Sequence, residues 1–119
     1  SLPPLHFDDK LTGNTQNKQP LINGVGPVDR VYHSANDSDK KMSIVDKQWH
    51  RTIDITTSNT AQWVFWNPGK AVADNMVDVH KGGENEYVCL EPANTQPQLI
   101  PAKSMVSISQ RIGLCSHLR

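Results

Sequence analysis

The sequence predicts an all-β protein built as an antiparallel β-sandwich. Short segments rich in β-branched and aromatic residues recur along its 119 residues, and clusters of Gly, Pro, Asn and Asp separate them. Only residues 70–79 show helical spacing, and this segment is too short to form a stable helix alone. The pattern therefore favours many short strands over alternating strands and helices, and no internal repeat competes with it.

The first part of the chain predicts short strands joined by exposed loops. Residues 1–27 are rich in Pro, Asn, Gln, Gly and Lys, and their short apolar runs lie at 5–7 and 21–22. Further on, the polar stretch 36–41 separates residues 31–32 from a candidate strand at 42–45. We expect a hairpin between these two strands.

The middle of the chain predicts two longer strands. Residues 51–57 alternate, with Ile53 and Ile55 on one face and polar side chains on the other, which is the pattern of a half-buried strand. Residues 62–66 read QWVFW and are apolar on both faces. They predict a central strand that is covered on both sides.

The last part of the chain predicts one or two helical turns followed by two strands. The turns fall within residues 70–79, and Gly82 and Gly83 end them. Residues 86–92 predict a strand with Tyr87, Cys89 and Glu91 on one face. The final strand is expected at 105–114, with a mostly apolar face made of Val106, Ile108, Gln110 and Ile112.

Composition excludes several classes of function. Twelve basic and twelve acidic residues give zero net charge, which is a poor basis for binding nucleic acid. No apolar run approaches the ~20 residues of a membrane span, and the first ten residues lack the pattern of a signal peptide. We therefore expect a cytoplasmic chain without a membrane partner.

The cysteines and histidines give no support for a metal site. Cys89 and Cys115 stand apart, with no CxxC spacing and no histidine at ligand spacing, which predicts two reduced thiols. The five histidines are scattered through turn-rich sequence, so none has a catalytic role on spacing alone. No local feature activates Cys89, which is expected to be a buried, inert thiol.

The length fits one domain over residues 1–119, but the core is expected to be thin. Hydrophobic residues make up 36% of the chain, and even with its seven glycines the apolar share stays below the ~45–50% of a typical domain. A free domain of this size must bury roughly two-thirds of its unfolded surface. The composition therefore raises the question of whether these residues pack against more protein.

Glu91 is the most informative candidate for chemistry, because an ionised carboxylate is rarely buried in an apolar strand without a partner or a function. Burial between Leu90 and Pro92 would favour its protonated form and suit it to proton transfer near neutral pH. The alternative is an edge strand that leaves Glu91 in water. The sequence pattern favours neither environment over the other.

Asp29 is the second candidate. Adjacent Asp29 and Arg30 usually form a solvated ion pair, and spacing alone favours that interpretation by about two to one. An aspartate can also bind sugar hydroxyls, because its two oxygens accept hydrogen bonds in a fixed geometry. Trp63, Phe65 and Trp66 could form a stacking platform for a sugar, although core packing is expected for at least two of them.

Four segments together resemble one family. They are GPVDRVY at 26–32, WNPG at 66–69, YVCLEPAN at 87–94 and SQRI at 109–112. In order and spacing they resemble the D-hexose-6-phosphate mutarotases, also called glucose-6-phosphate 1-epimerases, of the aldose 1-epimerase superfamily. The likeness runs from about residue 5 to residue 112, and four motifs in order are specific where any one would be weak.

The resemblance implies a galactose mutarotase-like β-sandwich of which this chain is the C-terminal portion, less than half of a full-length member. It implies that Glu91 is the catalytic general base and that Asp29 hydrogen-bonds the sugar. The family's general-acid histidine and its phosphate-gripping arginines would lie upstream of this sequence. His6 does not match the motif of that histidine.

The implied activity is interconversion of the α and β anomers of a hexose 6-phosphate, an isomerase reaction. The base removes the proton of the C1 hydroxyl while the acid protonates the ring oxygen, so the ring opens and closes again as the other anomer. No metal or organic cofactor is implied. The implied partners are the hexose phosphate and the remaining N-terminal part of the same protein, without which the chain is expected to be incomplete and inactive.

Two other functions compete with this one. A non-catalytic carbohydrate-binding β-sandwich would use Asp29 and an exposed Trp to hold a sugar without turning it over. A purely structural fragment would bind no sugar. An imidazole opposite Glu91 would favour the enzyme over the binding domain.

Overall fold

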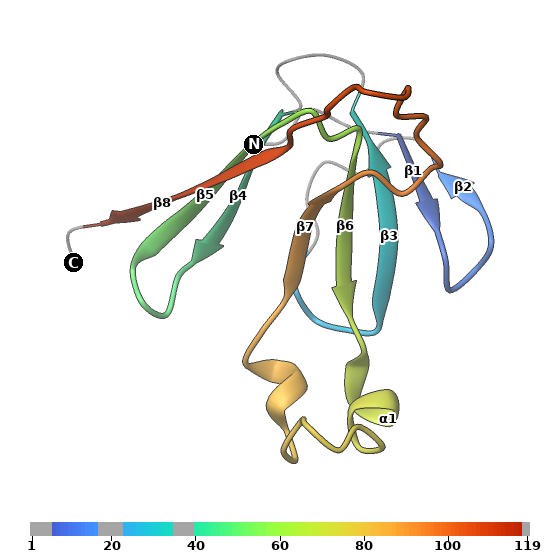
Figure 1. Ribbon diagram of the computed structural model, residues 1–119. Coiled ribbons are helices and arrows are strands. Elements are labelled where there is room, and N and C mark those ends of the chain that lie inside the picture. The colour runs from blue at the N-terminus through green and yellow to red at the C-terminus, as the bar shows by residue number, and fades with distance from the viewer. Residues whose placement is uncertain (1–5, 17–22, 35–39, 118–119) are drawn as a thin grey trace.

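The computed structural model of the chain describes residues 6–16, 23–34 and 40–117, and these form two antiparallel sheets (Figure 1). The five-stranded sheet has the order β2-β1-β3-β6-β7 and the three-stranded sheet has the order β4-β5-β8. The strands of the first sheet are β1 (His6–Asp9), β2 (Thr15–Gln16), β3 (Val28–His33), β6 (Gln62–Asn67) and β7 (Cys89–Ala93). Those of the second are β4 (Lys41–Asp46), β5 (Arg51–Ser58) and β8 (Ser109–Ser116).

The helix α1 (Gly69–Ala73) and the 3-10 turn η2 (Gly83–Asn85) lie at one end of the five-stranded sheet. The helix α1 follows β6, and η2 precedes β7, so both lie below these strands in Figure 1. The predicted helical turns at 70–79 thus begin one residue early and shorten to a single five-residue helix. In the described part of the chain no helix is long and apolar enough to cross a membrane.

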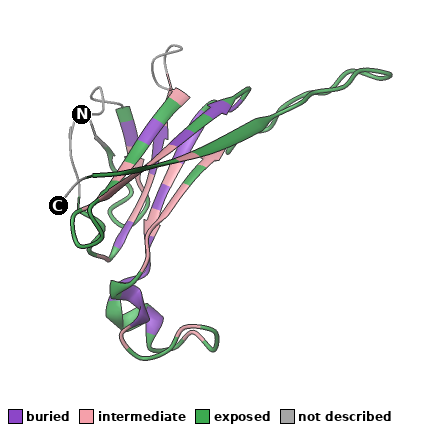
Figure 2. Ribbon diagram, turned by 90° about the vertical axis from the view of Figure 1, so that its left-hand side faces the viewer, coloured by how far each residue is buried: buried purple, intermediate pink, exposed green. Residues whose placement is uncertain are grey.

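The core lies between the two sheets. Its buried members come from both sheets, and Trp63 is 0% exposed: Phe7, Val28, Tyr32, Met42, Ile55, Trp63 and Phe65. Figure 2 shows most of the buried residues in the strands, while the segment that leads into β8, and β8 itself, are mostly exposed. The all-β sandwich is therefore confirmed, although its two sheets splay apart rather than closing over one another (Figure 1).

The central strands follow the sequence pattern. β6 lies between β3 and β7, which confirms the predicted interior strand, but the strand is not covered on both sides as predicted, because one of its faces is only partly buried. Trp63 and Phe65 enter the core, which confirms core packing for two of the three aromatic residues, whereas Val64 and Trp66 lie on the other face and are half-buried. The alternation of β5 is also confirmed, because Ile55 is buried and Thr56 is exposed.

The expected hairpin between residues 31–32 and 42–45 is wrong. β3 pairs with β1 and β6, whereas β4 pairs with β5 in the other sheet. Both edges of β3 are already occupied, and only residues 47–50 separate β4 from β5, so the entropic cost of closing that turn is small. The apolar run at 21–22 lies outside the described residues.

The last two strands begin later than predicted. β7 starts at Cys89, opposite Trp66, because the preceding residues belong to η2 and its flanks. β8 starts at Ser109, which pairs with Ser58 at the end of β5. Residues 105–108 extend beyond the end of β5 and have no strand partner there, so they leave the sheet.

Candidate functional site

One face of the five-stranded sheet gathers the candidate side chains. Residues paired across antiparallel strands share a face, and three such rows cross this sheet. Asp29 pairs with Trp66, which pairs with Cys89. The next row joins Asp8, Val31, Val64 and Glu91, and the third joins His6, His33, Gln62 and Ala93. The opposite face carries Trp63 and Phe65 and covers the core. We call the first face the outer face.

The structure therefore brings Asp29 and Glu91 to the same face. Asp29 and Glu91 are separated by two inter-strand spacings across the sheet and by two residues along the strand direction, which places their Cα atoms about 12 Å apart. Trp66 and Val64 lie between them on β6. The span can be bridged by a small ligand that contacts both carboxylates.

Glu91 lies in water on an edge strand, which is the second of the two environments that the sequence pattern left open. β7 is an edge strand of its sheet, and Glu91 is exposed. The carboxylate is therefore reachable from water and from a ligand in solution. Leu90, the residue beside it, points to the other face and packs against the core.

Cys89 is half-buried on the outer face, and its pKa is raised chiefly by burial and further by the neighbouring Glu91 carboxylate. A raised pKa leaves less of the nucleophilic thiolate at neutral pH. Both cysteines are free thiols, and Cys115 is exposed. The raised pKa agrees with the expectation that Cys89 is inert.

The two cysteines should therefore differ in alkylation. We expect iodoacetamide to modify Cys115 several times faster than Cys89, as measured by peptide mass spectrometry over a time course. Glu91→Gln should speed the modification of Cys89, because it removes a negative charge that disfavours the thiolate. Equal rates at the two cysteines would contradict this account.

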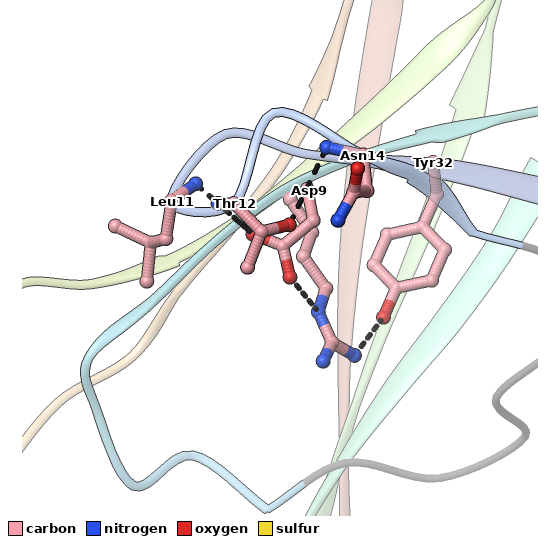
Figure 3. A network of polar contacts seen from close by, with 6 residues as sticks. Asp9, Leu11, Thr12, Asn14 and Tyr32 are labelled. Atoms are coloured by element: carbon pink, nitrogen blue, oxygen red, sulfur yellow. Dashed lines mark hydrogen bonds and ion pairs between the residues drawn. The ribbon is translucent and has the colours of Figure 1, made fainter.

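Asp29 does not pair with Arg30, because consecutive strand residues point to opposite faces. Arg30 lies on the core side, where its Nε is 3.8 Å from Asp9 and its guanidinium stacks 4.5 Å from the centre of the Phe7 ring. Figure 3 shows this network, in which an Arg30 nitrogen also donates to the Tyr32 hydroxyl at 3.4 Å. The solvated Asp29–Arg30 pair is thus wrong, and Asp29 is half-buried on the outer face.

Asp9 fixes the turn that follows β1. Its Oδ1 accepts hydrogen bonds from the backbone N–H groups of Leu11 and Thr12, at 3.0 and 3.2 Å (Figure 3). The same carboxylate holds the Arg30 side chain. It therefore anchors β1 beside β3 from the core side and leaves the outer face to other side chains.

Asn67 joins the segments that lead into the site strands, a role that the sequence analysis missed. The side chain is 1% exposed, and its Nδ2 donates to the backbone oxygens of Gly24, Glu84 and Tyr87 at 2.8–3.0 Å. Its Oδ1 accepts from the Gly69 N–H at 2.9 Å. These bonds tie the segment before β3 and the segment before β7 to the end of β6, so they set where Asp29 and Glu91 stand.

Gly26 is required beside Asn67. A Cβ at position 26 would stand 2.4 Å from Asn67 Oδ1 and 2.7 Å from the Gly69 nitrogen, both closer than real Cβ contacts allow. The glycines of the GPVDRVY and WNPG segments are therefore needed because the backbones of these two segments approach each other too closely for a Cβ atom. The Asn-Pro-Gly sequence directly after an aromatic strand was the available signal for this junction.

A second pair on the outer face was also missed. His33 Nε2 lies 2.9 Å from Asp8 Oδ2, and Thr15 Oγ1 donates to Asp8 Oδ1 at 3.0 Å. Hydrogen bonding by His33, and then by Thr15, lowers the pKa of Asp8. The two residues are 25 positions apart, so only the pairing of β1 with β3 brings them together.

Cations are scarce on the outer face. The positions that its three rows place there include no Lys or Arg. Lys70 lies on α1 and pairs with Asp74 at 2.7 Å. Within residues 6–16, 23–34 and 40–117, no three His, Cys, Asp or Glu side chains gather as a group that could hold a metal ion.

Comparison with known proteins gives a family match and one structural match. The family model described as aldose 1-epimerase matches residues 3–112. The crystal structure of a putative mutarotase (YeaD) from Salmonella typhimurium is similar, with a TM-score of 0.85 and 26% sequence identity. The match covers 96% of this chain but 39% of that chain, so this chain spans about two-fifths of its length. No curated protein matches.

Proposed function

Because the chain belongs to the aldose 1-epimerase family, we propose that it is part of an enzyme that interconverts the α and β anomers of a hexose 6-phosphate. In this proposal Glu91 is the general base and Asp29 binds the sugar. The observation that carries it is the placement of both carboxylates on the outer face, across Trp66 and Val64. The mutarotase-like fold of the structural match supports it.

The outer face suits a sugar ring. Val64 and Trp66 are half-buried on this face and form an apolar floor, on which the C–H face of a pyranose can rest, whereas Val31 beside them is buried. The exposed Glu91 can accept the proton of the C1 hydroxyl at one side of this floor. Asp29 can accept hydrogen bonds from hydroxyls at another side, since both of its oxygens are acceptors.

Another part of the protein completes the site in this proposal. The ring oxygen needs an acid when the ring opens, and a sugar phosphate needs cations. The rows of the outer face supply neither Lys nor Arg, and their two imidazoles, His6 and His33, lie across the face from Glu91, away from the end where C1 and the ring oxygen are placed. We assign both the acid and the phosphate ligands to an N-terminal part of the same protein, with this chain as the C-terminal portion of the sandwich.

The three-stranded sheet offers a place for that part to pack. Ile112 and Leu114 of β8 pair with Ile55 and Ile53 of β5, so they lie on the face that turns toward the interior. They nevertheless remain 62% and 66% exposed. Uncovered apolar side chains beside a free strand edge favour further strands there. The isolated chain is accordingly proposed to be inactive.

The test is anomer exchange by NMR. Purified α-glucose 6-phosphate should reach anomeric equilibrium much faster with the complete protein than in buffer, and the isolated chain should give no acceleration. Free glucose should exchange more slowly than the phosphate if cations from the other part bind the phosphate. No acceleration by the complete protein with either sugar would refute the proposal.

A carbohydrate-binding domain without turnover is the second candidate. The exposure of Glu91 favours it, because the carboxylate lacks the enclosed environment that often tunes a catalytic base. Such a domain would show sugar-dependent chemical-shift changes at Asp29 and Trp66 without faster exchange. The same NMR samples distinguish the two functions.

A further inference from the structure

We infer that Asp8 and His33 form a sugar-positioning pair on the outer face, with His33 accepting a hydrogen bond from a hydroxyl across the ring from C1. The inference rests on the proposed function, which places C1 at Glu91. Its structural basis is the 2.9 Å contact of His33 Nε2 with Asp8 and the register that puts His33 on the same face as Glu91.

The position of His33 matches the width of one sugar. His33 lies two residues beyond Val31 on β3, and Val31 is joined to Glu91 through Val64. The Cα atoms of His33 and Glu91 are therefore about 12 Å apart, the same span that separates Asp29 from Glu91. Because side chains on one face of a sheet stand roughly parallel, the two tips are about as far apart as the Cα atoms, and two hydrogen bonds of about 2.8 Å would leave about 6 Å, which one pyranose fills.

Asp8 prepares His33 for this contact. When the His33 ring carries a single proton, the Asp8 carboxylate holds that proton on Nε2, which leaves the lone pair on Nδ1. Thr15 holds the other Asp8 oxygen, so the carboxylate cannot turn freely away from the ring. The Asp8 side chain is 37% exposed and that of His33 is 28% exposed, so both are reachable by a ligand on the face.

The chemistry of the pair fits a hydroxyl rather than the phosphate. Asp8, Asp29 and Glu91 are all carboxylates, and no Lys or Arg shares their three rows. Although the charge of Lys10 reaches Asp8, the carboxylates disfavour an anionic group at this side of the floor, whereas a hydroxyl can donate to Nδ1. In a pyranose the carbons across the ring from C1 are C3 and C4. His33 is therefore assigned to a hydroxyl on one of these two carbons.

The test compares His33→Gln with the parent in the complete protein. Glutamine keeps a donor for Asp8, and it has a carbon instead of an acceptor at the position of Nδ1, since its amide oxygen lies one bond farther from the backbone. We expect KM for glucose 6-phosphate to rise by about 3- to 10-fold, the worth of one hydrogen bond, with kcat within about 2-fold. With either the 3-deoxy or the 4-deoxy sugar phosphate, parent and variant should have equal KM, because the hydroxyl is already missing.

Two further variants keep the test sharp. Asp8→Asn should raise KM by a smaller factor with the same dependence on the deoxy sugar. His80→Gln is the matched control, because His80 makes a similar 3.1 Å contact with Glu86 but lies away from the outer face. It should leave KM unchanged.

The inference fails if His33→Gln leaves KM for glucose 6-phosphate unchanged, or if KM rises equally with all three sugars, which a merely structural role would produce. Should His33→Gln not fold, Asp8→Asn decides by the same comparison. Failure of the proposed function is distinct, because the parent would then show no exchange with any sugar.

Discussion

Replacing Glu91 by Gln is expected to lower kcat for anomer exchange by about 10²- to 10⁴-fold, the usual contribution of a general base. Gln has nearly the same shape and can still hydrogen-bond the C1 hydroxyl, but it cannot take up its proton. Because Glu91 is exposed on the edge strand β7, the substitution removes no packing. The measurement is two-dimensional exchange NMR on the complete protein at saturating glucose 6-phosphate.

Glu86→Gln provides the control for this variant. Glu86 is also exposed and lies five residues earlier, where its carboxylate contacts His80 at 3.1 Å. Its replacement should leave kcat within about 2-fold, because it lies outside the rows that define the outer face. If Glu91→Gln exchanged the anomers as fast as Glu86→Gln, Glu91 would not be the base.

The strands were predictable where the pattern is local. The alternation of residues 51–57 predicts β5, and the aromatic run at 62–66 predicts β6. Both can be predicted because the alternation of buried and exposed side chains is visible in neighbouring residues. Which strand pairs with which depends on segments that are far apart in the sequence. The sequence therefore predicted a hairpin from β3 into β4, whereas both edges of β3 are taken by strands from elsewhere in the chain.

The two candidate site residues were predictable for different reasons. Glu91 stood out as a carboxylate in an apolar strand, and Asp29 gained weight through the family resemblance, but their shared face depends on β6 lying between their strands. Asp8 and His33 could not be found, because 25 positions separate them and β1 carries little pattern of its own. Asn67 was hidden for a similar reason: its partners come from two distant segments, one before β3 and one before β7.

The core offers the sharpest test of the fold itself. Trp63→Ala is expected to lower the free energy of unfolding by about 3–5 kcal/mol, because it empties a large site in the core. Trp63 is 0% exposed and packs where both sheets contribute side chains. Total stabilities of roughly 5–15 kcal/mol are typical, so the variant should lose a large share of the total. Urea titration, followed by the fluorescence of Trp49 and Trp66, measures the change.

Trp49→Ala is the matched substitution. Trp49 is 65% exposed in the β4–β5 turn, and its ring contacts the Arg51 guanidinium at 5.7 Å. An exposed cation–π contact is worth about 0.5–1 kcal/mol, so this variant should lose no more than that. Because the same atoms are removed from each variant, the difference between their losses in free energy of unfolding measures the contribution of burial at Trp63. Equal losses would mean that Trp63 does not pack between the sheets, and the core described by its buried residues would then be wrong.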